Sequence, residues 1–150
     1  MKRILIALLL FAGAAAQEYA PLPKTIMEGK TVYIENQTGN PAVADAAYLE
    51  IKTWGRFTVV SDRQEADLTF TFQAISTEGP IVVVPLSGGP VVGGRTTRNF
   101  TRLAVLSPEG HELWTVTQPA SGSKNLKKSG AAKCIRELRK RFPEPKKEKR

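Results

Sequence analysis

The sequence predicts an α/β (α+β) domain, in which a mixed, largely antiparallel β-sheet carries an early crossover helix and a C-terminal helix packed on one face. Three observations predict it. Apolar residues recur at helical spacing in 43–54, alternate with polar residues in 66–73 and 100–117, and form a second helical stripe in 131–142. Because an amphipathic helix must bury its stripe, both helices are expected to pack on the sheet within a single domain over 31–142.

A signal peptide is predicted over residues 1–16. Lys2 and Arg3 precede an apolar run, and small alanines stand directly before Gln17, which is the pattern of a secretory signal. The run from Ile4 to Ala16 has 13 residues, whereas a membrane-spanning helix needs about 20. We therefore expect a periplasmic or secreted chain, cleaved near Gln17, that does not span a membrane.

Residues 17–30 are predicted to be an extended lead-in, because they contain two prolines and no periodicity. A short strand follows over Thr31–Glu35. A helix comes next, since Asn40 can cap it, Pro41 is tolerated at its first position and Gly55 can end it. The apolar stripe of this helix consists of Val43, Ala47, Ile51 and Trp54.

Strands follow the helix. Phe57–Val60 is strand-like, and Ala66–Gln73 alternates between apolar and polar residues. The polar stretch Ser61–Glu65 between them is short enough to turn a hairpin. The sequence therefore predicts that these two strands pair with each other.

A second hairpin is predicted near the end of the sheet. The segment Ser107–Gly110 has Pro108 at its second position and a glycine at its fourth, which is typical of a type I turn. It joins strand-like residues 100–106 to 111–117.

The valine-rich segment 79–95 contains two glycine pairs. A phosphate-binding loop needs Gly, four residues, then Gly-Lys-Ser/Thr opening a helix. Here Gly93 and Gly94 are followed by Arg95 and then by another strand-like stretch. The segment therefore predicts a hairpin, which is either a contact surface or a mobile edge hairpin.

A terminal helix is predicted to begin near Ser121 or Ser123 and to stop at Pro143. Residues 143–150 are expected to form a basic disordered tail. One face of the helix is apolar and consists of Ala131, Cys134, Ile135, Leu138 and Phe142.

Charge is unevenly distributed along the chain. Residues 124–150 hold 12 Lys/Arg against 3 Glu, whereas residues 17–123 hold 8 Lys/Arg against 11 Asp/Glu. Such asymmetry is typical of an interaction tail. The candidate polyanion contacts on the basic helix are Lys127, Lys128, Lys133, Arg136, Arg139 and Lys140.

The residues that carry most enzyme chemistry are scarce. The chain has one histidine, His111, predicted to be exposed in a turn, and one cysteine, Cys134, predicted to be a buried inert thiol. Neither a disulfide nor a Cys/His zinc site can be assembled from them. Trp54 and Trp114 lie on apolar stripes and are expected in the core. We expect no enzyme, no cofactor and no small-molecule substrate.

A short strand, "NQTG", a helix, then "GRFTVV" and "ADL" follow one another between residues 31 and 73. This order resembles the TolB amino-terminal domain and the α/β domains of CsgG-like secretion proteins. Residues 103–114 similarly resemble the last hairpin of small exported bacterial proteins of unknown function. The resemblance implies a mixed sheet with helices packed on it and a non-enzymatic role in the cell envelope.

Two functions stay open at the level of sequence. The first is an exported binding or assembly module of the bacterial cell envelope, whose sheet edge or 79–95 hairpin meets a protein partner. The second is a polyanion binder, whose basic helix and tail contact anionic lipid, polysaccharide or nucleic acid.

Overall fold

The computed structural model describes residues 20–84, 92–120 and 129–143. A five-stranded mixed sheet forms its centre, in the order β2-β1-β3-β4-β5. Strand β1 is parallel to both β2 and β3, whereas β3 with β4 and β4 with β5 are antiparallel. The predicted fold class is confirmed. The strands are β1 (Thr31–Asn36), β2 (Thr58–Val59), β3 (Leu68–Val84), β4 (Val92–Leu106) and β5 (Glu112–Pro119).

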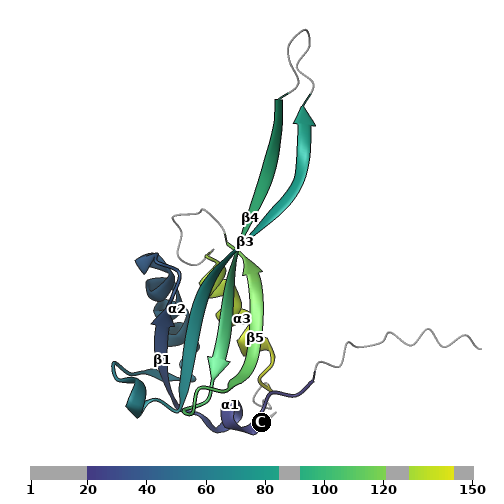
Figure 1. Cartoon of the computed structure of the whole chain (residues 1–150). Coiled ribbons are helices and arrows are strands. Elements are labelled where there is room, and N and C mark those ends of the chain that lie inside the picture. The colour runs from purple at the N-terminus through teal and green to yellow at the C-terminus, as the bar shows by residue number, and fades with distance from the viewer. Residues whose placement is uncertain (1–19, 85–91, 121–128, 144–150) are drawn as a thin grey trace, which may run out of the picture.

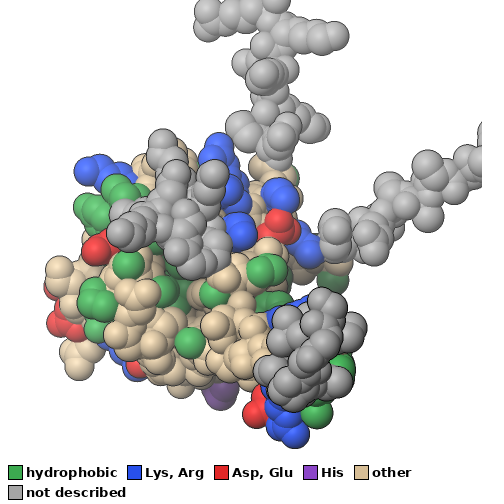
Figure 2. Space-filling view, turned by 90° about the horizontal axis from the view of Figure 1, so that it is seen from above, with side chains coloured by type: hydrophobic (Ala, Val, Ile, Leu, Met, Phe, Trp, Pro, Cys, Tyr) green, Lys and Arg blue, Asp and Glu red, His purple; other side chains and the backbone are tan. Residues whose placement is uncertain are grey.

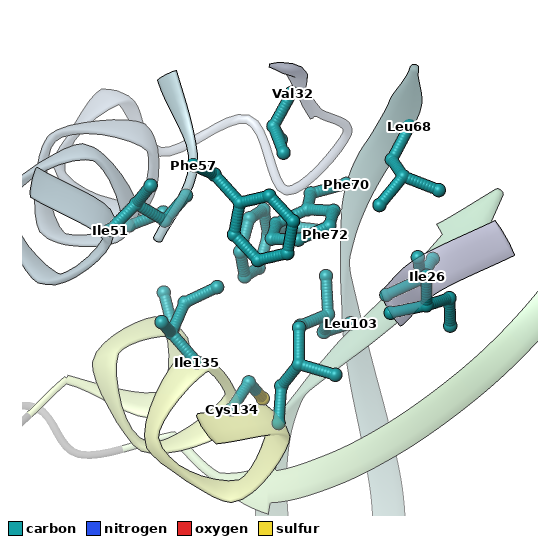
Figure 3. Close-up of a cluster of buried hydrophobic side chains, with 14 of the residues drawn as sticks. Ile26, Val32, Ile51, Phe57, Leu68, Phe70, Phe72, Leu103, Cys134 and Ile135 are labelled. Atoms are coloured by element: carbon teal, nitrogen blue, oxygen red, sulfur yellow. The ribbon is translucent and has the colours of Figure 1, made fainter. Parts of the chain in front are cut away.

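Helices α2 (Pro41–Trp54) and α3 (Gly130–Lys140) cover one face of this sheet (Figure 1). Ile51 of α2 and Ile135 of α3 lie in the same core as the inward-facing side chains of the central strands (Figure 3). The central strands supply fully buried Phe70, Phe72, Leu103 and Val105.

Helix α2 begins and ends where the sequence predicts. The Asn40 side chain accepts a hydrogen bond from the Ala42 amide at 3.1 Å, and Pro41 occupies the first turn. Gly55 adopts φ 72° and its amide bonds to the carbonyl of Ile51 at 3.0 Å. This left-handed conformation favours glycine at the helix end.

Helix α3 begins later than predicted. Ser129 caps it, because its hydroxyl accepts a hydrogen bond from the Ala132 amide at 3.2 Å. Gly130 then presses against β4, so that a Cβ on it would lie 2.5 Å from Oγ1 of Thr101. Ser121 and Ser123, the predicted caps, lie outside the described residues.

The predicted lead-in is not extended throughout. A single helical turn, α1 (Lys24–Glu28), follows Pro23. It buries Ile26 completely, and Leu22 just before it is also buried. A single turn is too short to show a periodic apolar pattern in the sequence. Its helical conformation therefore depends on packing against the core.

The predicted hairpin between Phe57–Val60 and Ala66–Gln73 is wrong. Strand β1 lies between β2 and β3 and is parallel to both, with Val32 opposite Val59 on one side and Leu68 on the other. A 3₁₀ turn, η1 (Arg63–Glu65), occupies the connection.

A carboxylate fixes β1 beside β3. Asp67, directly before β3, accepts hydrogen bonds from the amides of Lys30 at 2.8 Å and Thr31 at 3.1 Å. Its own amide donates to the Thr31 hydroxyl at 2.9 Å. These contacts join residues far apart in the chain, and they account for β1 pairing where β2 was expected.

The turn between β4 and β5 is confirmed. The Gly110 amide bonds to the Ser107 carbonyl at 2.9 Å, and Gly110 adopts φ 89°. His111 is exposed beside it, as predicted. Trp54 and Trp114 both pack against the core and are half-buried.

Candidate interaction surface

Strands β3 and β4 continue past the rest of the sheet as a two-stranded ribbon (Figure 1). The last pairing of β1 with β3 is Asn36 with Phe72, and the last pairing of β5 with β4 is Pro119 with Phe100. Beyond these, β3 and β4 pair with each other as far as Val84 and Val92. We call residues 77–84 and 92–98 the arm. The predicted 79–95 hairpin is confirmed as its outer part by the pairing of Ile81–Val84 with Val92–Arg95. Residues 85–91, between the two strands, lie outside the described residues.

The sequence explains why the arm leaves the core. Alternate residues of a strand face the same side of the sheet, so the positions after Phe72 on the helix-covered side are Ala74, Ser76 and Glu78. None of them offers a large apolar side chain for a helix to cover. β-Branched threonine, isoleucine and valine residues nevertheless keep the chain extended.

A β-bulge separates the inner and outer parts of the arm. The pairing register shifts between Glu78 and Ile81, so that Gly79 and Pro80 lie opposite Thr96. A Cβ on Gly79 would lie 2.4 Å from Oγ1 and 2.8 Å from the carbonyl oxygen of Thr96. Glycine is therefore required at this position, and bulges of this kind bend a ribbon and disturb its edge.

The charged residues of the described arm lie beside the bulge or on its body side. Arg95 donates a hydrogen bond to the Glu78 carboxylate at 2.5 Å, and the two side chains are 63% and 70% exposed. Such an exposed ion pair contributes little to stability. Arg98 is exposed and opposite Thr77. The sequence prediction does not include Glu78, Arg95 and Arg98 as candidate site residues. The β-branched threonines next to them, Thr77, Thr96 and Thr97, are the signal that the strands continue into the hairpin.

The outer part of the arm exposes apolar side chains. Ile81 is 60% and Val83 is 55% exposed, and the sequence from Ile81 to Gly94 contains no charged residue. A continuous run of valine and isoleucine normally belongs to a strand buried on both faces. Here the same kind of run lies on a projecting ribbon, which makes the outer arm the strongest candidate interaction surface among the described residues.

The structure describes four of the six predicted polyanion contacts, and polyanion binding by them stays a prediction. Lys127 and Lys128 lie outside the described residues. Arg136 pairs with Glu50 of α2 at 3.3 Å, and Lys140 pairs with Glu137 at 2.6 Å. Lys133 is half-buried and Arg139 is exposed on α3. Seen from above, basic side chains lie among acidic and uncharged ones, so this view shows no continuous basic patch (Figure 2).

The thiol is not a reactive nucleophile. Cys134 is completely buried, and its Sγ lies 3.4 Å from the carbonyl oxygen of Thr101. Burial raises the pKa of this thiol to about 12, and a protonated thiol is a poor nucleophile. The prediction of an inert thiol is confirmed.

An open hollow at the base of the sheet contains the remaining polar cluster. Backbone hydrogen bonds from Lys30 and then Thr31 hold the pKa of Asp67 below its ordinary value of 3.8. This carboxylate therefore stays ionised near neutral pH and cannot act there as a general acid. The hollow is lined by Thr25, Glu28, Gly29, Lys30, Asp67 and Pro108.

In the part of the chain that the structure describes, no group of three or more His, Cys, Asp or Glu side chains could hold a metal ion. None of the helices in residues 20–84, 92–120 and 129–143 is both long and apolar enough to cross a membrane.

Comparisons with known proteins give distant structural likeness alone. No protein-family model and no curated protein sequence matches the chain. A PelC L103M dodecamer from Paraburkholderia phytofirmans is 14% identical over 75% of this chain and 84% of that one, with a TM-score of 0.40. Uncharacterized lipoprotein B from Nitrosomonas europaea is 20% identical over 79% and 73%, with a TM-score of 0.34. A minor lipoprotein from Acinetobacter baumannii is 11% identical over 81% and 82%, with a TM-score of 0.36. The expected likeness to TolB and CsgG-like domains stays a prediction.

Proposed function

We propose that the chain is an exported, non-enzymatic binding or assembly module of the bacterial cell envelope, and that the arm is its binding element. The exposure of Ile81 and Val83 at the outer end of the arm is the observation that carries this proposal. Exposed apolar side chains contribute little to folding, and those gathered on one surface element are typical of an interaction site. The predicted signal peptide over 1–16 supports export.

The rest of the molecule supports a scaffold role. The core is formed by the helix-covered part of the sheet, and its members Phe70 and Leu103 are completely buried. Burial keeps Cys134 a protonated thiol. The Asp67 carboxylate joins the start of β1 to the start of β3 through the amides of Lys30 and Thr31. We propose residues 31–142 as the single domain that presents the arm, preceded by the lead-in 17–30 and followed by the tail 143–150.

The test removes the arm and keeps the sheet. Ser76 and Asn99 are paired, so residues 77–98 can be replaced by an Asn-Gly turn, which suits a two-residue hairpin loop. We expect the full chain to sediment with isolated cell envelopes and the arm-shortened chain to stay in the supernatant. A matched control, Leu49→Ser, removes an apolar side chain that is 47% exposed on α2 and should sediment like the full chain. Equal sedimentation of the arm-shortened chain would overturn the proposal.

Polyanion binding by the basic end is a second candidate, favoured by the exposure of Arg139 on α3. We propose Lys127, Lys128, Lys133, Arg136, Arg139 and Lys140 as its contacts, with the pairing of Arg136 and Lys140 to glutamates reducing the available charge.

Heparin affinity at rising salt tests this second function. Binding through counterion release should weaken steeply as salt rises. The double variant Lys133→Gln with Arg139→Gln should weaken it further, while the arm-shortened chain should bind as well as the full chain. Binding that is insensitive to salt, or lost with the arm, would contradict it.

A further inference from the structure

The side chains of the arm change in character along its length. Ile81 and Val83 occupy the outer part, Arg95 lies opposite Ile81, and Arg98 lies three residues further back toward the body, opposite Thr77. Val83 is thus the outermost of these side chains, Ile81 and Arg95 lie level with each other, and Arg98 lies nearest the body. An element that enters the boundary of a lipid layer has the same order, with apolar groups among the acyl chains and Lys or Arg at the headgroups.

The arm holds its apolar side chains away from the body. A strand rises about 3.3 Å per residue, so Val83 lies roughly 7 Å farther out along the arm than Ile81. Arg98 lies roughly 10 Å closer to the body than Ile81. Because the arm projects from the body (Figure 1), its end can enter a lipid layer while the body stays in water.

The edges of the arm are poorly suited to strand addition. The bulge at Gly79 and Pro80 breaks the edge of β3, and Pro80 has no amide hydrogen to donate. The edge of β4 carries Arg95 and Arg98 next to a glycine pair. Bulges, prolines and edge charges are the features that protect strands from pairing with other chains. A partner is therefore expected to contact the side chains of the outer arm, and not to pair with its backbone.

A membrane-spanning position is equally disfavoured for a lone ribbon. Within the described ranges, the outer edges of both arm strands have no neighbouring strand, and unpaired backbone groups are costly in the hydrocarbon interior. At the headgroup boundary water still reaches these groups, so a shallow position satisfies both the backbone and the apolar side chains.

We infer that the partner of the arm is an anionic lipid surface, into which Ile81 and Val83 insert while Arg98 contacts lipid phosphate. This inference rests on the proposed function, since it names the partner of the same element. Arg95 is engaged by Glu78, whereas the side chain of Arg98 forms no ion pair or hydrogen bond with the described residues and is available to a phosphate. A guanidinium matches phosphate oxygens in both charge and geometry.

Vesicle sedimentation of the full chain is the first test. Vesicles of phosphatidylcholine mixed with anionic phosphatidylglycerol should bind the chain, and phosphatidylcholine alone should bind it more weakly. The double variant Ile81→Ser with Val83→Ser should lose at least tenfold in affinity, because two apolar side chains no longer leave water. Arg98→Gln should lose about fivefold, as expected for one basic residue at an anionic surface. The matched variant Leu49→Ser should bind like the full chain, and Arg139→Gln reports whether the basic end contributes to vesicle binding.

A label at the end of the arm gives a second readout. Cys134 is buried and stays protonated, so an Ile81→Cys chain can be labelled at position 81 with a polarity-sensitive dye. Its emission should shift to the blue on the mixed vesicles. The same dye on a Leu49→Cys chain should not shift.

The outcomes separate this inference from the proposed function. If the chain ignores both kinds of vesicle while the arm-shortened chain is still lost from envelopes, the lipid inference is wrong and the arm binds a protein. If Arg139→Gln weakens vesicle binding and the Ile81 and Val83 double variant does not, the basic end binds lipid and the inference is again wrong. If the arm-shortened chain stays on envelopes, the proposed function fails as well.

Discussion

The inner and outer parts of the β3–β4 hairpin differ in what covers them. In the inner part, Phe72 and Leu103 are paired across the strands and completely buried under the helices. In the outer part, Ile81 and Val83 continue β3 and belong to the same antiparallel pairing with β4, yet more than half of each side chain is exposed. Apolar strand residues are therefore expected to stabilise this fold only where a helix covers them, and the uncovered ones are those that we propose for contact with a partner.

The largest difference is expected from core and arm substitutions. Phe72→Ala should lower the free energy of unfolding by about 3–5 kcal/mol, because it leaves a cavity beneath the helices. Ile81→Ser should change it by less than about 0.5 kcal/mol, as is usual for exposed positions. Urea unfolding of both variants measures this. Comparable losses would mean that the arm contributes to folding.

Two glycines give a matched steric comparison. A Cβ on Gly130 would lie 2.8 Å from Cβ of Thr101, and a Cβ on Gly79 would lie 2.8 Å from the carbonyl oxygen of Thr96. Gly130→Ala should cost about 1–3 kcal/mol of global stability, because it overpacks the contact between α3 and β4. Gly79→Ala should leave urea unfolding unchanged and speed amide hydrogen exchange in the arm alone. Slower exchange in the arm, or unchanged stability of Gly130→Ala, would contradict the comparison.

A pH-dependent effect is expected in the body. Asp67→Asn removes the charge that accepts the Lys30 and Thr31 amides and should cost about 1 kcal/mol at pH 7. The folded pKa of Asp67 is lowered, so its contribution is complete above its unfolded pKa and is lost as pH falls through the folded pKa. Urea unfolding at pH 7 and in acid should therefore show the two chains converging at low pH. A constant gap would contradict this assignment.

The smallest effects are expected from ion pairs. Arg136→Gln leaves Glu50, which is 16% exposed, without this partner and should cost about 0.5 kcal/mol. Arg95→Gln breaks a pair whose members are both more than 60% exposed and should cost nothing measurable. Thermal unfolding at low and high salt checks both, and a larger loss for Arg95→Gln would show that the arm is held by charge.

Local signals in the sequence predicted the parts of the body that depend on neighbouring residues. Asn40, Pro41 and Gly55 mark the bounds of α2, and Ser107 to Gly110 mark a turn, because capping and turn geometry involve residues a few positions apart. The alternation of Leu68, Phe70 and Phe72 likewise identified the buried part of β3.

Contacts between distant residues explain what the sequence could not predict. The place of β1 depends on Asp67 reaching Lys30 and Thr31, and the partner of Arg136 comes from another helix. The sequence does not predict the full length of the arm, because Ser76–Pro80 interrupts the apolar alternation and is typical of a loop. The strand conformation of this segment depends on its pairing with Arg95–Asn99 of β4.

The free energy of unfolding of the arm-shortened chain, with Asn-Gly joining Ser76 to Asn99, tests most directly whether the arm is separate from the fold. The core residues Phe70, Phe72, Leu103 and Val105 all remain in that chain. We predict a urea-unfolding free energy within about 0.5 kcal/mol of the full chain, together with a smaller dependence on urea because less surface is exposed on unfolding. A loss of several kcal/mol would contradict the account, because it would show that the arm stabilises the body.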